Sequence, residues 1–305
     1  MKAFDVLVAG EINPDLILSG DVVPAFGQVE KLVEAATLTI GSSSAIFACG
    51  AARLGLRVAF IGLCGDDVFG RFMLDEMSRR NVDVSNVISV PGGVTGLSVI
   101  LNRGTDRAIL TVPGLISALT AQDISDDLLR QAPHLHVASY FLQTALQPGL
   151  PTLFQRAHSL GLSTSLDTNY DPSEQWAGFD QLLAVTDVFL PNEAEACSLT
   201  RSASTEPAAQ QLSGRVKTLA LKLGAQGALG LADGQLVRVA SLPVSVVDTV
   251  GAGDSFDAGF IYAYLQGWPL EKSLRLAAVC GALSTQQPGG TAAQPTLQEA
   301  LRELS

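Results

Sequence analysis

The sequence is poor in cysteine and histidine, which argues against several kinds of metal and redox site. Its four cysteines lie far apart and form no Cys-x-x-Cys pair, so a disulfide framework or a zinc site is not expected. Reduced, mostly buried thiols fit this spacing better. The three histidines show no metal-ligand spacing with a helical acid, and we expect structural or surface roles for them.

Basic residues are also scarce. The 305 residues include 19 lysines and arginines against 30 acidic residues, and the net charge is -11 without any basic run. This balance argues against a nucleic-acid partner. If the protein binds an anionic ligand, helix termini, backbone amides and a bound cation must supply the local positive potential.

Long apolar runs are absent, since no stretch approaches the length of a bilayer-spanning helix. The apolar segment Phe4–Ala9 is too short for a signal-peptide core, and only Lys2 precedes it. We therefore expect no membrane partner and a cytoplasmic location. Hydrophobic residues still make up 47% of the chain, which permits a sizeable core.

Several motifs of nucleotide enzymes are missing. The chain has no Gly-x-x-x-x-Gly-Lys-Ser/Thr loop and no Gly-x-Gly-x-x-Gly after its first strand. It also lacks a protein-kinase loop and a Gly-x-Ser-x-Gly nucleophile elbow. These absences exclude the P-loop, dinucleotide, protein-kinase and α/β-hydrolase classes from consideration.

Strand-like and helix-like segments alternate along most of the chain. This alternation predicts a mostly parallel sheet with helices on both faces, and ligands beyond the carboxyl ends of the strands. Two stretches, approximately 11–40 and 95–112, look β-like without helices and would form a small separate sheet, with a hairpin turn at Gly104–Asp106. The predicted helices are Ser44–Leu54, Asp67–Arg80, Pro151–Leu160, Glu193–Leu199, Ala252–Gln266, Leu270–Thr285 and Thr296–Leu304.

The most informative segment is Asp248–Phe256, which reads Asp-Thr-Val-Gly-Ala-Gly-Asp-Ser-Phe. Free backbone N–H groups at a helix start favour negative charge, and a carboxylate beside them can take a proton from a hydroxyl. Together they suggest phosphoryl transfer from a nucleotide to an alcohol. The same residues also suit an ordinary glycine turn before a helix, and the local pattern alone favours that interpretation.

The segment resembles the signature of the ribokinase (PfkB) family of carbohydrate kinases, and other segments agree in the family's order. They are Gly10–Asp15, Ala51–Gly55 followed by Phe60–Gly70, Leu190–Glu195 and Leu223–Gly227. The similarity covers nearly the whole chain. It implies one ribokinase-like domain over 1–305, a three-layer sandwich with a mostly parallel central sheet. The segments near 11–40 and 95–112 would form a small β-sheet lid.

The resemblance also implies a catalytic arrangement. Asp254 would be the general base that deprotonates or orients the attacking sugar hydroxyl. The backbone N–H groups of Gly251, Ala252 and Gly253 would form an anion hole for the γ-phosphoryl group of ATP. Phosphoryl transfer needs mainly positioning and charge stabilisation, which such a site can supply.

Cation sites follow from the same resemblance. Asn192 and Glu195 would lie near Mg²⁺, with Glu195 acting through water, which suits a hard cation that keeps water ligands. The alternative is a helix start with an exposed acidic first turn. Asp248 resembles the family residue beside a monovalent-cation site, so K⁺ is a candidate cofactor.

On the nucleotide side, Lys222, Gly224 and Gly227 correspond to the family's strand and turn near ATP. Lys222 stands where a threonine is common in the family. Its side chain would reach the ATP phosphates or would face solvent. Ala278 stands where many relatives have asparagine, so the adenine contacts do not transfer residue by residue.

On the sugar side, Asp15 follows the first strand and Asn169 follows a later one, so both would face the ligand edge. The alternatives are a loop residue after Pro14 and, for Asp167 with Asn169, an Asx-type turn. Gly41 and Ser42 lie at the sugar-contacting helix start. Arg107 matches a position that is often basic in the family, whereas Arg103 would be a solvated charge.

The chain departs from the family at this helix start. The family usually reads Gly-Gly-x-x-x-Asn, and here Gly41–Ile46 reads Gly-Ser-Ser-Ser-Ala-Ile. Ile46 replaces a sugar-bonding amide, which would shift specificity. The serines would contact hydroxyl groups or cap the helix. Asp171 stands where many sugar-acid kinases carry arginine and would repel a carboxylate, which argues against 2-keto-3-deoxygluconate.

We therefore expect a kinase that uses Mg²⁺-bound ATP to phosphorylate a small neutral sugar, as a ribokinase or fructokinase does. A lid would exclude water, and two protomers could pair through it as a homodimer. One alternative is a nucleoside kinase of the same family, with Ile46 and Phe47 offering an apolar surface to the base. The other is a non-catalytic sugar- or nucleotide-binding relative, which the retained Asp254 argues against.

Overall fold

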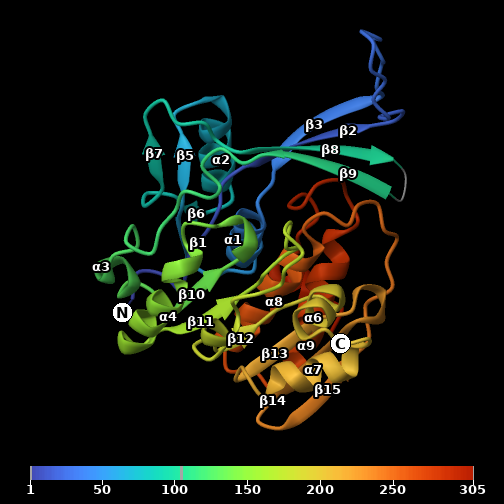
Figure 1. Cartoon of the computed structure of the whole chain (residues 1–305). Coiled ribbons are helices and arrows are strands. Elements are labelled where there is room, and N and C mark those ends of the chain that lie inside the picture. The colour runs from blue at the N-terminus through green and yellow to red at the C-terminus, as the bar shows by residue number, and fades with distance from the viewer. Residues whose placement is uncertain (1, 104–105, 305) are drawn as a thin grey trace.

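A computed structural model describes residues 2–103 and 106–304 of the chain. Its main body is a large sheet with the strand order β15-β14-β13-β12-β11-β10-β1-β4-β6 (Figure 1). The strands are β1 (Val6–Ala9), β4 (Val58–Ile61), β6 (Val82–Asp83), β10 (His134–Val137), β11 (Ser163–Leu166), β12 (Val188–Phe189), β13 (Thr218–Lys222), β14 (Ala228–Ala232) and β15 (Gln235–Val239). The sheet is parallel from β6 to β13, and β14 and β15 complete it in antiparallel fashion.

Strand β1 is the switch point of this sheet, because β4 flanks it on one side and β10 on the other. Connections from the two sides leave in opposite directions at such a strand, which opens a crevice at the carboxyl ends. The loops after β1, β10, β11, β12 and β13 therefore end at one edge of the sheet, where the candidate site lies.

Helices cover both faces of the sheet. On one face lie α1 (Ser43–Arg53), α2 (Val68–Arg79), α8 (Ala252–Leu265), α9 (Leu270–Ser284) and α10 (Leu297–Arg302). On the other lie α3 (Asp126–Leu129), α4 (Leu150–Ser159), α5 (Asp180–Leu183), α6 (Glu193–Thr200) and α7 (Thr205–Ser213). Single 3₁₀ turns occur at Tyr140–Leu142, Gln147–Gly149 and Gly224–Gln226.

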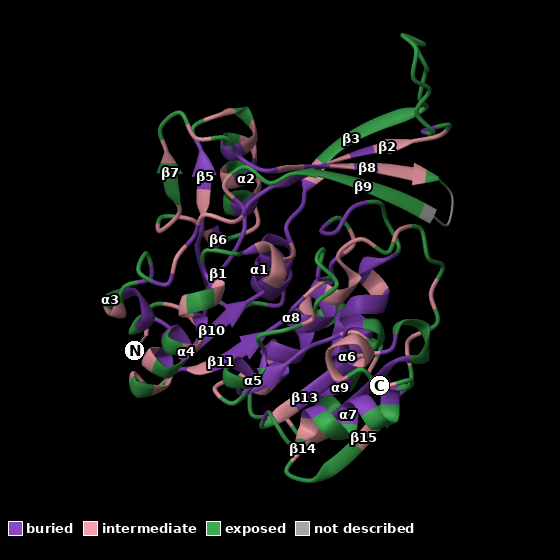
Figure 2. Cartoon of the chain, viewed as in Figure 1, coloured by how far each residue is buried: buried purple, intermediate pink, exposed green. Residues whose placement is uncertain are grey.

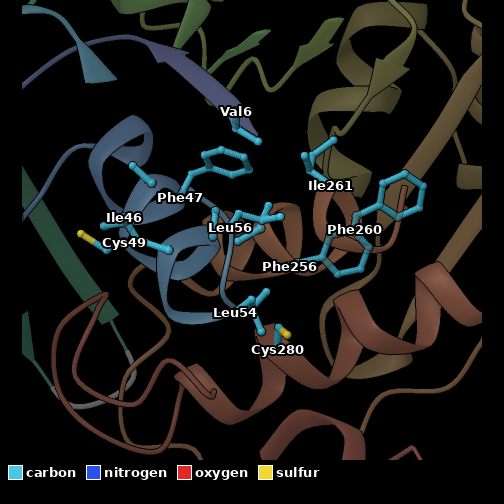
Figure 3. Packing of buried hydrophobic residues seen from close by; sticks show 14 of the residues in the cluster. Val6, Ile46, Phe47, Cys49, Leu54, Leu56, Phe256, Phe260, Ile261 and Cys280 are labelled. Carbon is cyan, nitrogen blue, oxygen red and sulfur yellow. The ribbon is translucent and has the colours of Figure 1, made fainter. Parts of the chain in front are cut away.

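The alternation of side chains along each strand divides the interior into two cores. Val6 and Val8 of β1 join the core beneath α1, α8 and α9, whereas Leu7 and Ala9 join the core beneath α4 and α7. In the first core, Phe47 of α1 packs near Phe256 and Phe260 of α8 (Figure 3). In Figure 2 the central strands β1 and β10 are purple, whereas β15 at the edge of the sheet is mostly green.

Two of the histidines belong to this interior. His134 and His136 of β10 are buried and hydrogen bond to Ser163 and Ser165 of β11. Burial lowers the pKa of His134 to about 3, so its ring is neutral in the folded protein. These histidines have structural roles, as their alternation along a strand predicts.

A smaller sheet projects from the main body (Figure 1) and has the order β3-β2-β8-β9. Its strands are β2 (Pro14–Ser19), β3 (Ala35–Ile40), β8 (Leu97–Arg103) and β9 (Asp106–Val112). The predicted hairpin joins β8 to β9, but Gly104 and Thr105 of its turn lie outside the described residues. A short parallel pair, β5 (Leu63–Gly65) and β7 (Ile88–Val90), lies beside α2 (Figure 1).

The structure corrects two sequence interpretations. The stretch expected to be β-like over approximately 11–40 is interrupted, because β3 begins only at Ala35 and residues 29–34 are exposed loop. Residues 202–207, which belong to none of the predicted helices, contain the start of α7 at Thr205. A proline in the first helical turn needs no intrahelical N–H bond, so Pro207 is compatible with a helix start.

Within residues 2–103 and 106–304, no helix has both the length and the apolar character needed to cross a membrane.

Candidate active site

Two cavities meet at the start of α8. The larger, of about 790 Å³, lies between the strand ends of the main sheet and the small sheet. The smaller, of about 490 Å³, lies between the loop after β15 and helices α8 and α9. Four residues line both of them, namely Lys222, Gly224, Thr249 and Gly253. A group that passes from one cavity to the other must pass these residues.

The turn before α8 depends on Gly251. Its φ of 72° lies in the left-handed region, and a Cβ there would lie 2.6 Å from the Gly290 Cα and 2.9 Å from Ile46 Cγ2. A side chain would therefore be both strained and obstructed. The N–H of Ala252 reaches the Thr249 carbonyl at 3.3 Å. The N–H groups of Gly251 and Gly253 have no hydrogen-bond acceptor among the described residues, which suits an anion hole.

Asp254 lies in the first turn of α8, lines the larger cavity and is only 7% exposed. Burial raises its pKa well above the usual range, and the nearby Asp167 carboxylate raises it further. The Lys222 ammonium and a hydrogen bond from Ser43 act in the opposite direction. A carboxylate with a raised pKa is a stronger base, which suits proton abstraction from a hydroxyl.

Beside Asp254 lies a buried ion cluster centred on Lys222. The Lys222 Nζ donates to Asp167 Oδ2 at 2.9 Å and to Asp257 Oδ2 at 3.0 Å. Burial lowers the pKa of Lys222, but Asp167, Asp257 and Glu195 together outweigh this effect, so the net shift is upward and the ammonium stays charged. The alternative of a solvent-facing Lys222 is therefore wrong, because the side chain is 11% exposed.

Asp257 is a member of the site that the sequence analysis missed. It lies one helical turn after Asp254, and its Oδ1 has no hydrogen-bond partner in the described structure. The signal was the spacing in Gly-Asp-Ser-Phe-Asp, since residues three apart share a helix face. An acid three residues after a candidate base could therefore have been recognised as a candidate member of the same site.

Asn192 and Glu195 form a reciprocal pair at the start of α6. The Glu195 N–H donates to Asn192 Oδ1, and the Glu195 carboxylate accepts from the Asn192 N–H and Nδ2. Glu195 is 5% exposed, which contradicts the exposure that the alternative of an acidic helix start expects, but the pair does cap this helix start, as that alternative predicts. Burial, and then Asp167, raise its pKa to about 7. Both residues line the larger cavity, and each Glu195 oxygen keeps acceptor capacity for a water of a hydrated cation.

The larger cavity brings together most of the predicted sugar-side residues. Asp15, Asn169 and Arg107 line it, and Ser42 and Ser43 face it from the start of α1. Burial raises the pKa of Asp15 to about 7, although the charge of Arg107 opposes the shift.

Gly41, another predicted contact, is buried behind Asp15 and does not line the cavity. A Cβ there would clash with the Asp15 carboxylate, so Gly41 leaves room for it. Arg103 is exposed at the end of β8 and lies away from the cavity.

Two of the serines at the start of α1 have structural partners, so their hydroxyl groups are not free to bind a ligand. The Ser42 hydroxyl accepts from the Ala45 N–H and donates to the Glu11 carbonyl. Its φ of 65° is left-handed, which explains why glycine suits this position. The Ser44 N–H and hydroxyl both donate to the Glu11 carboxylate, which leaves Ser43 as the serine that can bind a ligand.

Glu11 and Ser139 were also missed. The Ser139 hydroxyl donates to Glu11 at 2.8 Å and accepts from Asn169 Nδ2 at 2.9 Å. This chain joins the ends of β1, β10 and β11, so it holds the floor of the cavity together. Glu11 could have been found, because it directly follows the first strand in the quoted motif, whereas Ser139 carries no local signal.

Asp171 does not play the part expected of it. Its carboxylate accepts from the Ser173 N–H and hydroxyl and from the Trp176 N–H, and it does not line the cavity. Asp171 closes a turn after Asn169. The expectation that its carboxylate repels a carboxylate substrate is therefore wrong.

The apolar surface expected from Ile46 and Phe47 is corrected for Phe47, whereas Ile46 does line the larger cavity. Phe47 is fully buried and stacks on His136 with ring centroids 3.6 Å apart. Ile46 packs against the backbone of Gly251 and Gly290 and is almost fully buried (Figure 3). Phe47 serves the core, whereas Ile46 supports the glycine turn and lines the larger cavity.

Asp248 lies just before the glycine turn but lines neither cavity. Its carboxylate accepts from the N–H groups of Val250 and Gly289 and so joins two loops. Gly227 lines the smaller cavity with φ 91°, where any side chain would clash with the Val239 carbonyl. Ala278 lines the same cavity, as expected for the nucleotide side.

The sequence pattern of the pfkB family of carbohydrate kinases matches residues 3–297. The 5-dehydro-2-deoxygluconokinase of Geobacillus thermodenitrificans is 31% identical over 282 residues, with 86% of this chain and 83% of that protein covered. The ribokinase of Haemophilus influenzae is 27% identical over 306 residues, with 97% of each covered.

Solved structures share the fold. A putative ribokinase II from Escherichia coli, in complex with ATP and Mg²⁺, superimposes with a TM-score of 0.87 at 24% identity, covering 99% of both chains. The expected architecture, a large mostly parallel sheet with helices on both faces and a smaller separate sheet, is therefore confirmed.

Proposed function

The chain belongs to the pfkB family of carbohydrate kinases, and on that premise we propose that it transfers the γ-phosphate of ATP to a hydroxyl of a small neutral sugar. Asp254 is the general base, and the backbone at Gly251–Gly253 is the anion hole. The observation that carries the proposal is the junction of the two cavities at Gly253, with Asp254 buried on the side of the larger one.

The two cavities suit the two substrates. ATP occupies the smaller cavity, whose walls include apolar residues of α8 and α9 such as Phe256, Ala278 and Ala282. The sugar occupies the larger cavity with one hydroxyl against Asp254. Asp254 takes the hydroxyl proton as the new O–P bond forms, and the bond to ADP breaks. Lys222, Gly224 and Gly227 line the nucleotide side of this path.

Cations complete the proposed site. Asn192 and Glu195 would hold waters of a Mg²⁺ ion bound to ATP, and the unused acceptor capacity of the buried Glu195 carboxylate fits this role. Mg²⁺ supplies charge neutralisation on the phosphates. Asp248 fits beside a K⁺ ion in the loops that it joins, which removal of K⁺ from the assay tests directly.

The walls of the larger cavity favour a neutral polyol. The acidic groups Asp15 and Glu11 lie at its floor, and carboxylates can accept hydrogen bonds from sugar hydroxyls but repel an anionic acceptor. A nucleoside is the second candidate, because Ile100, Ile109 and Ile116 give the cavity one apolar wall that suits a base.

The small sheet is proposed as the lid and as the contact between two protomers. Its inner face carries Arg107 and Ile109 toward the cavity. On the opposite face the strand register aligns an apolar row across all four strands, namely Leu38, Leu16, Val99 and Leu110. Figure 2 shows β3 and β9 as exposed, and such an apolar surface suits a partner sheet from a second copy.

The proposal is tested by a coupled ATP assay with neutral pentoses, hexoses and nucleosides, with and without K⁺. We expect turnover with at least one sugar and its loss in Asp254→Ala, with an unchanged circular dichroism spectrum. A protein that turns over no acceptor, and whose Asp254→Ala variant binds ligand as well as wild type, would instead be a non-catalytic binding relative.

A further inference from the structure

Lys222 occupies an unusual place between the two cavities. It is one of the four residues that line both, and it is the only one of the four with a charged side chain. A Cβ at Gly253 would lie 3.5 Å from the Lys222 Nζ, so the ammonium lies directly beside the proposed anion hole. Any phosphoryl group at Gly253 therefore lies within reach of this positive charge.

We infer that the Lys222 ammonium, anchored by Asp167 and Asp257, is a catalytic group that contacts the phosphoryl group in transit from ATP to the acceptor. The inference rests on the proposed kinase function. It goes beyond nucleotide binding, because it assigns to Lys222 a contact that is strongest in the transition state.

The anchoring fixes the ammonium in advance of the reaction. Its hydrogen bonds in the described structure go to Asp167 and Asp257, and an ammonium has a third N–H. Donors that are already oriented toward developing charge lose little free energy to reorganisation, and a buried position strengthens them. Asp257 is thus a positioning residue, because it acts through Lys222.

The cost of burying this cluster also points to function. Three carboxylates, Asp167, Asp254 and Asp257, lie within 4.8 Å of one another, close enough to share a metal ion. The ammonium already bridges two of them, so the cation of this cluster belongs to the chain itself. Apolar residues of similar size often replace a buried ion pair without loss of stability, so we do not expect this cluster to serve stability alone.

The test compares steady-state kinetics of the wild type with Lys222→Met, Asp257→Asn and the control Lys217→Met. Lys217 also forms an ion pair with an aspartate, Asp187, but its side chain is 77% exposed and lines neither cavity. The acceptor is the best substrate found in the sugar panel. ATP affinity without acceptor is measured by isothermal titration calorimetry.

We expect Lys222→Met to lower kcat by about 10²–10³-fold, the loss typical of removing one preorganised donor to a transition state. The dissociation constant for ATP should change by less than about threefold, because a contact made mainly in the transition state leaves ground-state binding intact. Asp257→Asn should lower kcat about tenfold, since Asp167 still holds the ammonium. Lys217→Met should match the wild type.

Lys222→Met leaves Asp167 and Asp257 without their counter-charge and can fail to fold. The double variant Lys222→Met/Asp257→Leu removes a charge of each sign, and its folding is checked by thermal unfolding. It should show the same loss of kcat. A double variant with kcat within about fivefold of the wild type, or a Lys222→Met variant that changes only ATP affinity, would overturn the inference.

Failure of the proposed function looks different. In that case the wild type itself transfers no phosphate to any acceptor, and the inference falls with it. Failure of the inference alone appears as an active wild type beside an equally active Lys222 variant.

Discussion

The two cavities differ in how the chain builds them. We propose the smaller cavity as the nucleotide side and the larger one as the acceptor side. The nucleotide side is formed by one continuous part of the sequence, from β13 through α9, and its lining includes glycines at turns, such as Gly224 and Gly227. The acceptor side collects side chains from five strand ends and from the small sheet, which is distant in sequence. Backbone contacts tolerate little change, whereas side chains can be exchanged one by one. We therefore expect the acceptor to vary more readily than the chemistry at the phosphate.

The largest effect is expected at the boundary between the cavities. Asp254→Asn keeps the shape of the side chain but removes the base, and we expect kcat to fall by about 10³-fold or more. The measurement is kcat with saturating ATP and acceptor, and Asp180→Asn at the exposed start of α5 is the control. Full activity of Asp254→Asn would show that positioning alone drives the reaction.

The glycine turn allows a matched comparison on the nucleotide side. Gly251 and Gly267 both have left-handed φ, 72° and 67°, but a Cβ meets neighbours only at Gly251. Gly267→Ala should cost about 1–2 kcal/mol of stability and leave kcat unchanged. Gly251→Ala should also lower kcat, by about 10²-fold, because the anion hole is displaced. Equal kcat values in the two variants would show that the turn at Gly251 does not contribute to catalysis.

On the acceptor side, Asp15→Asn removes a charged hydrogen-bond acceptor. Hydrogen bonds to charged groups contribute about 1.5–3 kcal/mol, so kcat/KM for the acceptor should fall about 10–100-fold. The KM for ATP should not move, since Asp15 lines only the larger cavity. A change confined to ATP would contradict the assignment of the two cavities.

The pH profile sharpens the same comparison. Burial, assisted by Asp167, raises the pKa of Asp254, and only its ionised form accepts a proton. The acid limb of kcat/KM should therefore lie above the range of an exposed carboxyl, with a tenfold loss for each pH unit below it. A limb near pH 4 would mean that the base is exposed during turnover.

The contribution of Asp15 to stability should fall as the pH rises, whereas activity should rise. Asp15 has a folded pKa raised to about 7, so the folded state binds more protons than the unfolded state between about pH 4 and pH 7. Its contribution to stability falls as the pH rises through this window. Asp15→Asn lacks this loss of stability. The difference between the Tm of the variant and the Tm of the wild type should therefore be more positive at pH 7 than at pH 4.

The smallest kinetic effect is expected at the outer face of the small sheet. Leu110, 60% exposed in the apolar row, should lie at the contact between protomers. Leu110→Glu should shift the mass measured by light scattering from dimer to monomer and change kcat by less than about threefold. The control is Ser19→Glu at the strand end. A wild type that is monomeric at all concentrations would remove the proposed contact.

Most of the fold could be predicted from the sequence because its signals are local. The periodicity of Ala252–Leu265 and Leu270–Ser284 located both helices within one residue of their ends. The start of α7 was missed because Thr205-Glu-Pro reads equally well as a turn.

The candidate site was less predictable, since its contacts join distant segments. Asp254 and Gly251 could be recognised from a motif within one short segment. The burial of Lys222 between Asp167 and Asp257 depends on three separate elements and cannot be seen in any one of them. The expectation for Asp171 was wrong for a different, local reason, because the N–H groups of its own turn occupy its carboxylate.

The bridge from Lys222 to Asp257 also constrains how such a chain can evolve. Loss of Lys222 alone leaves Asp257 as a buried charge without its counter-charge, a change that commonly costs several kcal/mol. Positions 222 and 257 should therefore covary among homologues. Among homologues with this helix start, those that carry an uncharged residue at position 222 should also lack the acid at position 257, and a sequence alignment can count the exceptions.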